Sequence, residues 1–271
     1  MEINKKTNFI TSISTKKSSL GSNMHNSAYK HLGLNFIYFE TETKDCKNAI
    51  NGIKAMNFRG SAVSMPYKRE VMKYLDRIDP IAKKIGAVNT VLNKRGFLIG
   101  YNSDWIGAVE SLKEITNLKN KIVVIIGAGG AARAIAYGLK RNKSKVIILN
   151  RAHKKAKKLA RDFNLIYGGK LSDFNKIRDY DILINATSVG SYPHNKKSVI
   201  KEKDMKKDKI VMDVVFEPLE TNFLKNAKMK NCRIIPGYKM LVLQALFQFK
   251  TWTSKKAPKK VMENSLLKIL K

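Results

Sequence analysis

Apolar positions along the chain follow a repeating pattern of strands and helices, and the pattern is clearest at residues 122–126. Five apolar residues stand there in a row, which predicts a strand buried on both faces, as in a parallel sheet. A helical pattern follows at residues 131–140, and a second apolar run follows at residues 145–149. A strand, a helix and a strand in this order predict a βαβ unit.

The same alternation extends over the rest of the chain and predicts an α/β fold. Short apolar segments predict strands at residues 8–13, 35–39, 59–64, 87–92, 97–101, 181–185, 209–213 and 232–235. Helical spacing predicts helices at residues 24–32, 44–56, 70–85, 105–115, 153–163, 240–252 and 261–270. Residues 16–23 are Ser-rich and polar, and we expect a loop there.

A glycine-rich turn joins the strand at residues 122–126 to the helix after it. Gly127, Gly129 and Ala132 fit the G-x-G-x-x-G/A pattern of dinucleotide-binding turns. The first glycine permits a tight turn, the second lets the backbone approach a pyrophosphate, and the alanine lets the helix pack on the strand. The free N–H groups of the helix N-terminus would bind the phosphates. The alternative is a glycine-rich turn that holds no nucleotide.

The end of the second strand of this unit favours NADP over NAD. An NAD site carries an acidic residue about 20 residues past the glycines, where it accepts the ribose hydroxyls. Here the strand ends in Asn150 and Arg151, and Lys154 and Lys155 follow. A guanidinium can bind the 2′-phosphate of NADP in a bidentate manner. The alternative is that Arg151 forms a surface ion pair and the lysines are solvated.

The chain is strongly basic, with 53 Lys and Arg against 21 Asp and Glu and a net charge of +32. Such a charge attracts nucleic acid, anionic membranes or anionic small molecules. The sequence lacks an aromatic-interleaved basic groove and an RNA-binding motif, which favours a Lys-rich solvated surface. A non-catalytic nucleic-acid- or anion-binding protein is the rival function class. We expect neither nucleic acid nor membrane as a partner.

Two cysteines, Cys46 and Cys232, provide neither a disulfide framework nor a metal-ligand cluster, so we expect no metal. The N-terminus lacks the apolar stretch of a signal peptide. No apolar run approaches the roughly 18 residues of a membrane span. We therefore expect a cytoplasmic protein.

Eight motifs make the chain resemble the shikimate dehydrogenase family over nearly its whole length. They occur in the family's order: A-V-S-M-P-Y-K at 62–68, G-A-V-N-T at 86–90, Y-N-S-D at 101–104, G-A-G-G-A-A-R at 127–133, N-R at 150–151, N-A-T-S-V-G at 185–190, D-V-V-F-E-P at 213–218 and G-Y-K-M-L-V-L-Q at 237–244. In the family's N-terminal S-x-S-P-x-x-H-N motif, this chain has Gly21 for the second Ser and Ser22 for the Pro, and Phe216 stands where a Tyr is usual. The N-terminal substitutions, together with A-V-S at 62–64 and G-L-N-F-I-Y at 33–38, make the chain resemble the shikimate dehydrogenase-like branch.

The resemblance implies two α/β domains with the active site in a cleft between them. The substrate domain would cover residues 1–104, with the helices of residues 238–271 packing back onto it, and a Rossmann-type NADP-binding domain would cover residues 105–237. The implied activity is the reversible reduction of 3-dehydroshikimate to shikimate by an NADP-dependent oxidoreductase of the shikimate pathway, which leads to the aromatic amino acids. The alternative is a quinate/shikimate dehydrogenase or a related cyclic hydroxy-acid dehydrogenase. The chain would be a monomer or a homodimer.

The resemblance also implies a catalytic pair, Lys68 and Asp104. A ketone reduction needs a proton at the developing alkoxide, and an ammonium with a carboxylate beside it can supply one. The alternatives are a solvated surface lysine and a helix N-cap aspartate.

The remaining site predictions concern binding. The resemblance makes Asn89 and Gln244 ligands of substrate hydroxyls, and an Asn in an apolar strand needs a paired amide. Ser22 and Ser64 are candidates for substrate carboxylate or hydroxyl contacts, although either could be an ordinary loop or N-cap serine. We expect His25 to be a helix-packing histidine. The predicted cofactor-binding residues are Gly127, Ala128, Gly129, Gly130, Ala131, Asn150, Arg151, Thr187 and Gly237.

Overall fold

The computed structural model describes residues 3–16 and 18–270, which fall into two compact α/β units. The first unit takes in the chain up to Ser103 together with Val242–Ile269, and the second takes in Asp104–Leu241. The division therefore lies between Ser103 and Asp104 and again within a C-terminal helix. Among the described residues, no helix is both long enough and apolar enough to cross a membrane.

The first unit is built on a six-stranded mixed sheet with the order β2-β1-β3-β5-β6-β4. Its strands are β1 (Asn8–Ser14), β2 (Phe36–Glu42), β3 (Gly60–Val63), β4 (Arg77–Ile78), β5 (Thr90–Lys94) and β6 (Phe97–Tyr101). Strands β2, β1 and β3 are parallel, and β5 runs antiparallel to both β3 and β6. The carboxyl ends of β1, β3 and β6 therefore meet the start of β5 at one edge of the sheet.

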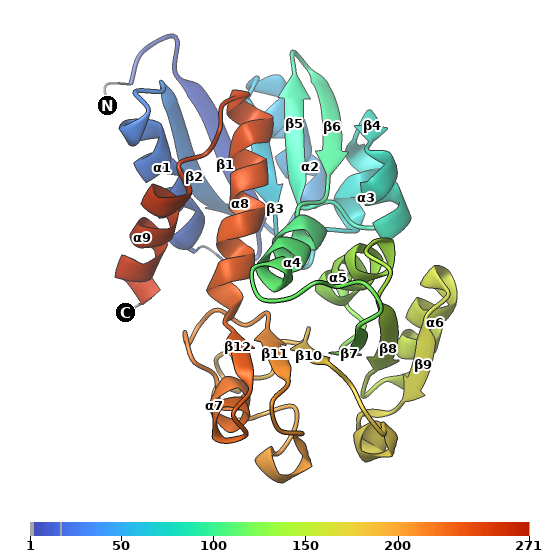
Figure 1. Ribbon diagram of the computed structural model, residues 1–271. Helices are drawn as coiled ribbons and strands as arrows, with labels where there is room; N and C mark the ends of the chain where they lie inside the picture. The colour runs from blue at the N-terminus through green and yellow to red at the C-terminus, as the bar shows by residue number, and fades with distance from the viewer. Residues whose placement is uncertain (1–2, 17, 271) are drawn as a thin grey trace. The chain divides into compact units, whose positions relative to one another are not determined.

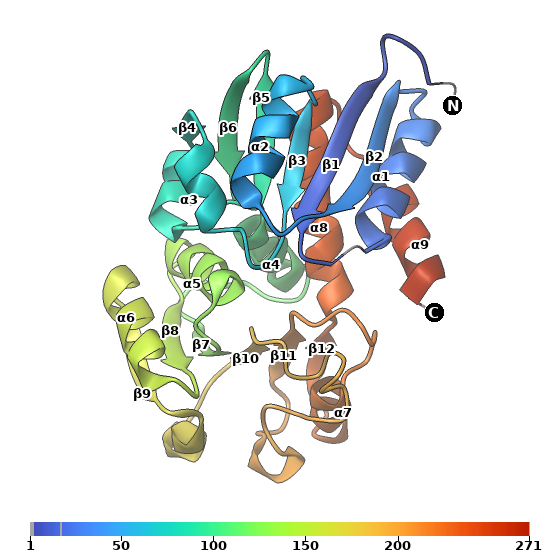
Figure 2. The same ribbon diagram turned by 180° about the vertical axis from the view of Figure 1, so that it is seen from behind.

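Helices cover both faces of this sheet. They are α1 (Leu20–His31), α2 (Cys46–Ala55), η1 (Glu70–Tyr74), α3 (Pro80–Ile85), α8 (Gly237–Thr253) and α9 (Lys259–Leu270). Helix α8 crosses one face (Figure 1), and α2 with α3 covers the opposite face (Figure 2). The indole of Trp252 anchors α8, because its Nε1 donates to the carbonyl of Val91 at 2.9 Å. Apolar side chains of α2, including Ile50 and Ile53, fill the core on the other face.

Two sequence predictions for this unit are wrong. Residues 20–23 are the first turn of α1 and not part of a loop, because Leu20 is buried and anchors the turn. The helix expected at residues 70–85 is divided into η1, β4 and α3. Pro80 cannot continue a preceding helix, and Asp79 caps a new one by accepting from the amides of Ile81 and Ala82.

The second unit contains a six-stranded parallel sheet with the order β12-β11-β10-β7-β8-β9. Its strands are β7 (Ile122–Ile126), β8 (Lys145–Leu149), β9 (Ile166–Gly169), β10 (Ile182–Asn185), β11 (Ile210–Asp213) and β12 (Arg233–Ile235). Its helices are α4 (Asp104–Lys113), α5 (Gly130–Arg141), α6 (His153–Phe163), η2 (Leu171–Lys176), η3 (Glu202–Asp204) and α7 (Asn222–Met229).

Strand β7 is buried on both faces, as its unbroken apolar run predicts. Val123 and Ile125 lie in one core with α5, whereas Val124 and Ile126 lie in the opposite core with α7. The βαβ unit predicted from the apolar pattern is therefore confirmed. The pattern missed β9 and α7. Ile166 and Tyr167 on β9 are exposed at the edge of the sheet, where no apolar alternation develops.

Candidate functional site

One edge of the first unit's sheet gathers polar residues from four separate segments. Ser64 and Lys68 follow β3, Asn89 directly precedes β5, and Ser103 follows β6. The antiparallel course of β5 brings these positions to the same edge. Gln244 reaches this edge from α8, where its Oε1 accepts from Asn89 Nδ2 at 3.2 Å.

Asn89 is the centre of this polar cluster, and its side chain is almost fully buried at 2% exposure. Its Nδ2 donates to Ser103 Oγ at 2.9 Å. Its Oδ1 accepts from Thr90 Oγ1 at 2.8 Å and from the Ser103 amide at 2.8 Å. The prediction that this amide is paired is confirmed. A buried amide with so many partners holds one orientation, because turning it would leave several polar groups unsatisfied.

Lys68 is half-buried in the turn after β3, and its backbone is tied to the segment that carries Asn89. The Val88 amide donates to the Lys68 carbonyl at 2.7 Å. The neighbouring Tyr67 is buried, and its hydroxyl donates to the Thr43 carbonyl at 2.8 Å. The turn therefore holds the backbone of Lys68 next to the residue that precedes Asn89. Ser64 is exposed at the start of the same turn.

Ser22 lies in the first turn of α1, where its hydroxyl donates to the Ser19 carbonyl at 3.1 Å. Its amide donates to Glu40 Oε1 at 2.8 Å. Within the described part of the chain, Ser22 makes no hydrogen bond to Asn89 or Gln244. A carboxylate such as that of Glu40 repels an anionic ligand at this position.

Asp104 is the first residue of α4 in the second unit and is 2% exposed. It follows Ser103 directly in the chain, and the amide and hydroxyl of Ser103 are both bonded to Asn89. A carboxylate in the first turn of a helix also interacts favourably with the positive end of the helix dipole.

The glycine turn after β7 has the geometry that a pyrophosphate requires. Gly127 has a φ of 124°, and a Cβ there would lie 2.8 Å from the carbonyl oxygen of Ala186. Gly129 precedes the first residue of α5, and a Cβ built on Gly129 or Gly130 meets no atom within 4 Å. The turn thus leaves open space in front of the N-terminus of α5, where free N–H groups bind anions. The residues present therefore fit a dinucleotide.

The end of β8 carries positive charge, and no acidic residue stands close to it along the chain. Asn150 is half-buried, and its Nδ2 donates to the Ala152 carbonyl at 3.1 Å. Arg151, Lys154 and Lys155 are exposed at the start of α6. The nearest acidic residue along the chain, Asp162, is paired with Arg133 at 2.8 Å. This arrangement suits a phosphate better than a pair of ribose hydroxyls.

A buried polar network organises the ends of β10 and β11. The amide and the hydroxyl of Thr187 both donate to Asn185 Oδ1, at 3.0 and 2.7 Å. Asn185 Nδ2 in turn donates to Asp213 Oδ1 at 2.9 Å, and Thr221 Oγ1 donates to Asp213 Oδ2 at 2.6 Å. Burial raises the pKa of Asp213 to about 6, although its hydrogen bonds act in the opposite direction. The network fixes Thr187 beside the glycine turn, since Gly127 packs against Ala186.

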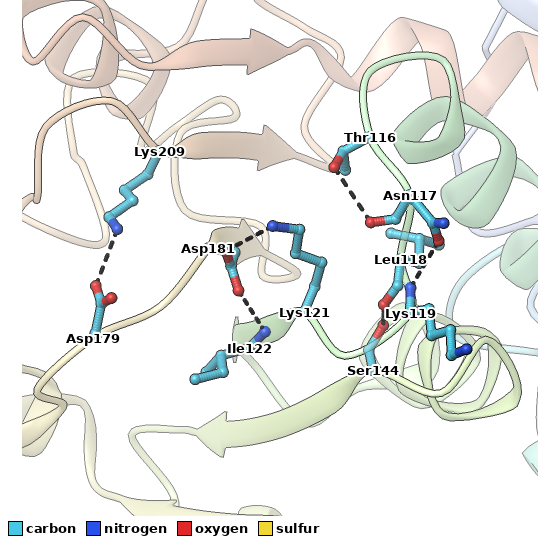
Figure 3. A network of polar contacts seen from close by, with 10 residues as sticks. All are labelled: Thr116, Asn117, Leu118, Lys119, Lys121, Ile122, Ser144, Asp179, Asp181 and Lys209. Atoms are coloured by element: carbon cyan, nitrogen blue, oxygen red, sulfur yellow. Dashed lines mark hydrogen bonds and ion pairs between the residues drawn. The ribbon is translucent and has the colours of Figure 1, made fainter.

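Carboxylates of the second unit are engaged at the opposite edge of the sheet, where the strands begin (Figure 3). Asp181 accepts from the Ile122 amide at 2.8 Å and pairs with Lys121 at 3.0 Å. Lys209 lies 3.0 Å from Asp179 and holds the pKa of that carboxyl below its ordinary value. These two carboxylates therefore lie away from the glycine turn, at the edge where the strands begin.

Sequence reasoning missed Thr90, Ser103, Gln248 and Asp213 as site residues. Three of them lie within the motifs quoted above, at positions where a strand begins or ends. A polar residue directly beside an apolar strand is the signal that could have identified them, because it must find a buried partner. Gln248 carries a weaker signal, namely its position one helical turn after Gln244.

Comparisons with known proteins agree along the whole chain. Residues 14–91 match the model of the shikimate dehydrogenase substrate binding domain, and residues 110–221 match that of shikimate / quinate 5-dehydrogenase. Residues 237–267 match the shikimate 5′-dehydrogenase C-terminal domain.

Individual relatives cover nearly the full length. The chain is 42% identical to a shikimate dehydrogenase (NADP(+)) of Methanococcus aeolicus over 261 residues, which are 93% of this chain and 94% of the relative. A crystal structure of a shikimate dehydrogenase with NADP+ is 39% identical with a TM-score of 0.92, covering 100% of this chain and 98% of that one. The Thermus thermophilus enzyme with NADP(H) and shikimate is 32% identical with a TM-score of 0.88, covering 97% and 99%.

Proposed function

The chain belongs to the shikimate dehydrogenase family, and we infer from this membership that it catalyses the reversible NADP-dependent reduction of 3-dehydroshikimate to shikimate. The observation that carries this assignment is identity above 40% over more than nine-tenths of the chain to an NADP-dependent enzyme of this name. The open glycine turn and the basic end of β8 are consistent with the same cofactor.

NADP, when bound, accepts or donates the hydride, and the residues of the chain bind the substrate and handle the proton. We place the Lys68 ammonium and the Asp104 carboxylate at the substrate hydroxyl that is oxidised. The ammonium would stabilise the developing alkoxide, while the carboxylate would orient that hydroxyl and share its proton. The tie between the Lys68 carbonyl and Val88 supports this role, because it holds the lysine close to Asn89 along the edge.

Asn89 and Gln244 are the proposed ligands of the other substrate hydroxyls. They are hydrogen-bonded to each other, so one substrate oxygen can contact both amides. Ser64 is exposed beside them and is the stronger candidate for the substrate carboxylate. Of the proposed contacts, Ser22 has the least support, because its amide is bonded to Glu40.

For the cofactor, we place the pyrophosphate at the turn formed by Gly127, Ala128, Gly129, Gly130 and Ala131. The adenosine 2′-phosphate would contact Asn150 and Arg151. Thr187 and Gly237 would line the nicotinamide side, since both lie at the carboxyl edge of the parallel sheet, Thr187 after β10 and Gly237 after β12.

The test is oxidation of shikimate by the purified chain with NADP+, followed at the nicotinamide absorbance. Quinate in place of shikimate addresses the second candidate activity, which the match to a shikimate / quinate model favours. We expect a higher kcat/KM for shikimate. Equal values, or a preference for quinate, would contradict the substrate assignment. Light scattering of the same preparation decides between monomer and homodimer.

A further inference from the structure

A buried line of hydrogen bonds leads from α1 through α8 to the amide of Asn89. It begins at His25, which is 1% exposed and enclosed by aromatic rings. The centroid of Tyr38 lies 4.9 Å from that of the imidazole, and the centroid of Trp252 lies 5.2 Å from it. The imidazole is hydrogen-bonded to the side chain of Gln248. Among the described residues its Nδ1 has no partner, so the bond is made by Nε2.

The line has a defined direction. Gln248 Nε2 donates to the Asn89 carbonyl and to Thr90 Oγ1, each at 3.2 Å. The oxygen of Gln248 is therefore the atom that accepts from Nε2–H of His25. Thr90 Oγ1, which accepts from Gln248, donates its own proton to Asn89 Oδ1 at 2.8 Å. Each hydrogen bond thus determines whether the next side chain acts as a donor or as an acceptor.

The direction of these hydrogen bonds decides which donor and acceptor atoms the polar cluster presents to a substrate. With Oδ1 of Asn89 held as an acceptor, its Nδ2 must donate, and one acceptor is Gln244 Oε1 at 3.2 Å. Gln244 then exposes its own Nε2, which has no hydrogen bond to any residue that the structure describes. The half-buried Gln244 is consequently presented with N–H donors toward a ligand oxygen.

We propose that His25, Gln248 and Thr90 are positioning residues that hold the amide of Asn89 in one orientation, and that Asn89 in turn holds Gln244 with its N–H donors toward substrate oxygens. This proposal rests on the proposed function for its effect on turnover, although the orientation itself can be measured separately. None of the three residues needs to touch the substrate. Their effect would pass through Asn89.

This direction requires a proton on Nε2 of His25, and the surroundings of the ring favour the neutral imidazole that carries its proton there. Burial lowers the pKa of His25 to about 3. The titratable groups packed against the ring are the phenols of Tyr29 on α1 and Tyr38 on β2, and burial raises the pKa of each. The residues of α8 that contact the ring, Gln248, Phe249 and Trp252, carry no charge. Glu40 lies beside Tyr38 and acts on that phenol.

The first test replaces the central hydroxyl. Thr90→Val keeps the shape but removes the donor to Asn89, so kcat/KM for shikimate should fall roughly tenfold to hundredfold while the KM for NADP stays unchanged. Thr90→Ser restores the hydroxyl and should recover activity to within about threefold of the parent. Thr251→Val is the matched control, because among the described residues its hydroxyl bonds within α8, to the Phe247 carbonyl at 2.8 Å. Parental kcat/KM in Thr90→Val, or failure of Thr90→Ser to recover it, would overturn the proposal.

The second test reads the tautomer of His25 by ¹⁵N NMR and does not depend on activity. We expect the Nε2–H form without titration between about pH 5.5 and pH 8, because burial lowers the pKa of His25 to about 3. In Gln248→Glu, the carboxylate should raise the pKa of the imidazole and make it titrate. An Nδ1–H tautomer of His25 in the parent would refute the proposed direction of the hydrogen bonds. A parent that shows the expected tautomer but does not oxidise shikimate would refute the proposed function alone.

Discussion

At the scale of single residues, Lys68 is distinguished by its surroundings. It is half-buried, and its carbonyl is bonded to Val88, next to Asn89. Lys73, five residues later, is exposed and makes no ion pair in the described part of the chain. The two lysines have the same side chain, which makes them a useful pair for testing a catalytic role.

The first prediction concerns the proposed catalytic pair. Lys68→Ala and Asp104→Ala should each lower kcat at saturating substrate by on the order of 10²–10⁴, since each removes a group that acts on the substrate proton. Lys73→Ala should leave kcat unchanged, and circular dichroism should confirm that all three variants are folded. A kcat near the parental value in either variant of the pair would exclude that residue from the chemical step.

The second prediction concerns cofactor choice. Arg151 is exposed at the end of β8, and no carboxylate follows it along the chain before Asp162. Arg151→Ala should raise the KM for NADP by roughly tenfold to hundredfold and change the KM for NAD little, because the lost contact belongs to the 2′-phosphate.

Arg178→Ala is the control for this experiment, since it removes the same charge from an exposed position elsewhere in the second unit. If Arg178→Ala weakened NADP as much as Arg151→Ala does, a general charge effect would explain the result. Equal losses for NADP and NAD in Arg151→Ala would also contradict this assignment of the pocket.

At the scale of elements, the turn between β7 and α5 assigns different tasks to its glycines. Gly127 is buried with a φ of 124° and packs against the Ala186 backbone. Gly129 has a φ of −85° and open space around its Cβ position. The first glycine is therefore required by the fold, and the second is required only when a ligand approaches.

The third prediction uses this difference. Gly127→Ala should lower the free energy of unfolding by roughly 1–3 kcal/mol, because it combines an unfavourable φ with a contact to rigid backbone. Gly129→Ala should leave the unfolding midpoint close to that of the parent but raise the KM for NADP. Differential scanning fluorimetry and cofactor kinetics on both variants provide the measurement. The interpretation fails if Gly127→Ala is as stable as Gly129→Ala.

At the scale of the whole molecule, each unit buries a group whose pKa burial moves well away from its ordinary value, His25 in the first and Asp213 in the second, and the two shifts have opposite effects on the pH dependence of stability. His25 in the first unit has its pKa lowered from 6.5 to about 3, so its contribution is present above pH 6.5 and is lost as the pH falls toward 3. Asp213 in the second unit has its pKa raised from 3.8 to about 6. Its contribution is greatest below pH 3.8 and is lost as the pH rises through 6.

The fourth prediction separates these two contributions. Asp213→Asn removes the buried charge, while Thr221 can accept from the new amide. The variant should therefore be more stable than the parent at pH 8 by on the order of 1–3 kcal/mol. This gain should shrink as the pH falls from 6 toward 4. The exposed Asp208→Asn is the control, and urea unfolding at several pH values gives the free energies. A gain that does not vary with pH would contradict the raised pKa of Asp213.

Some of this molecule could be predicted from the sequence because the signals are local. The apolar run of β7, the glycines after it and the apolar run of β8 are contiguous, so the βαβ unit and its dinucleotide turn follow from short-range rules. The same holds for the basic end of β8, where Asn150 and Arg151 stand in place of an acid. Burial on both faces is visible as an unbroken apolar strand.

The tertiary structure alone decided how the polar edge of the first unit is assembled. Asn89 finds partners 14 residues away in Ser103 and 155 residues away in Gln244, and no periodicity along the chain records such pairings. The start of α1 and the division of residues 70–85 also depended on packing and capping. Local sequence specifies which backbone conformations are favourable. Hydrogen bonds between distant segments exist only once the sheet has brought its strand ends together, because the reach of a side chain is a few ångströms.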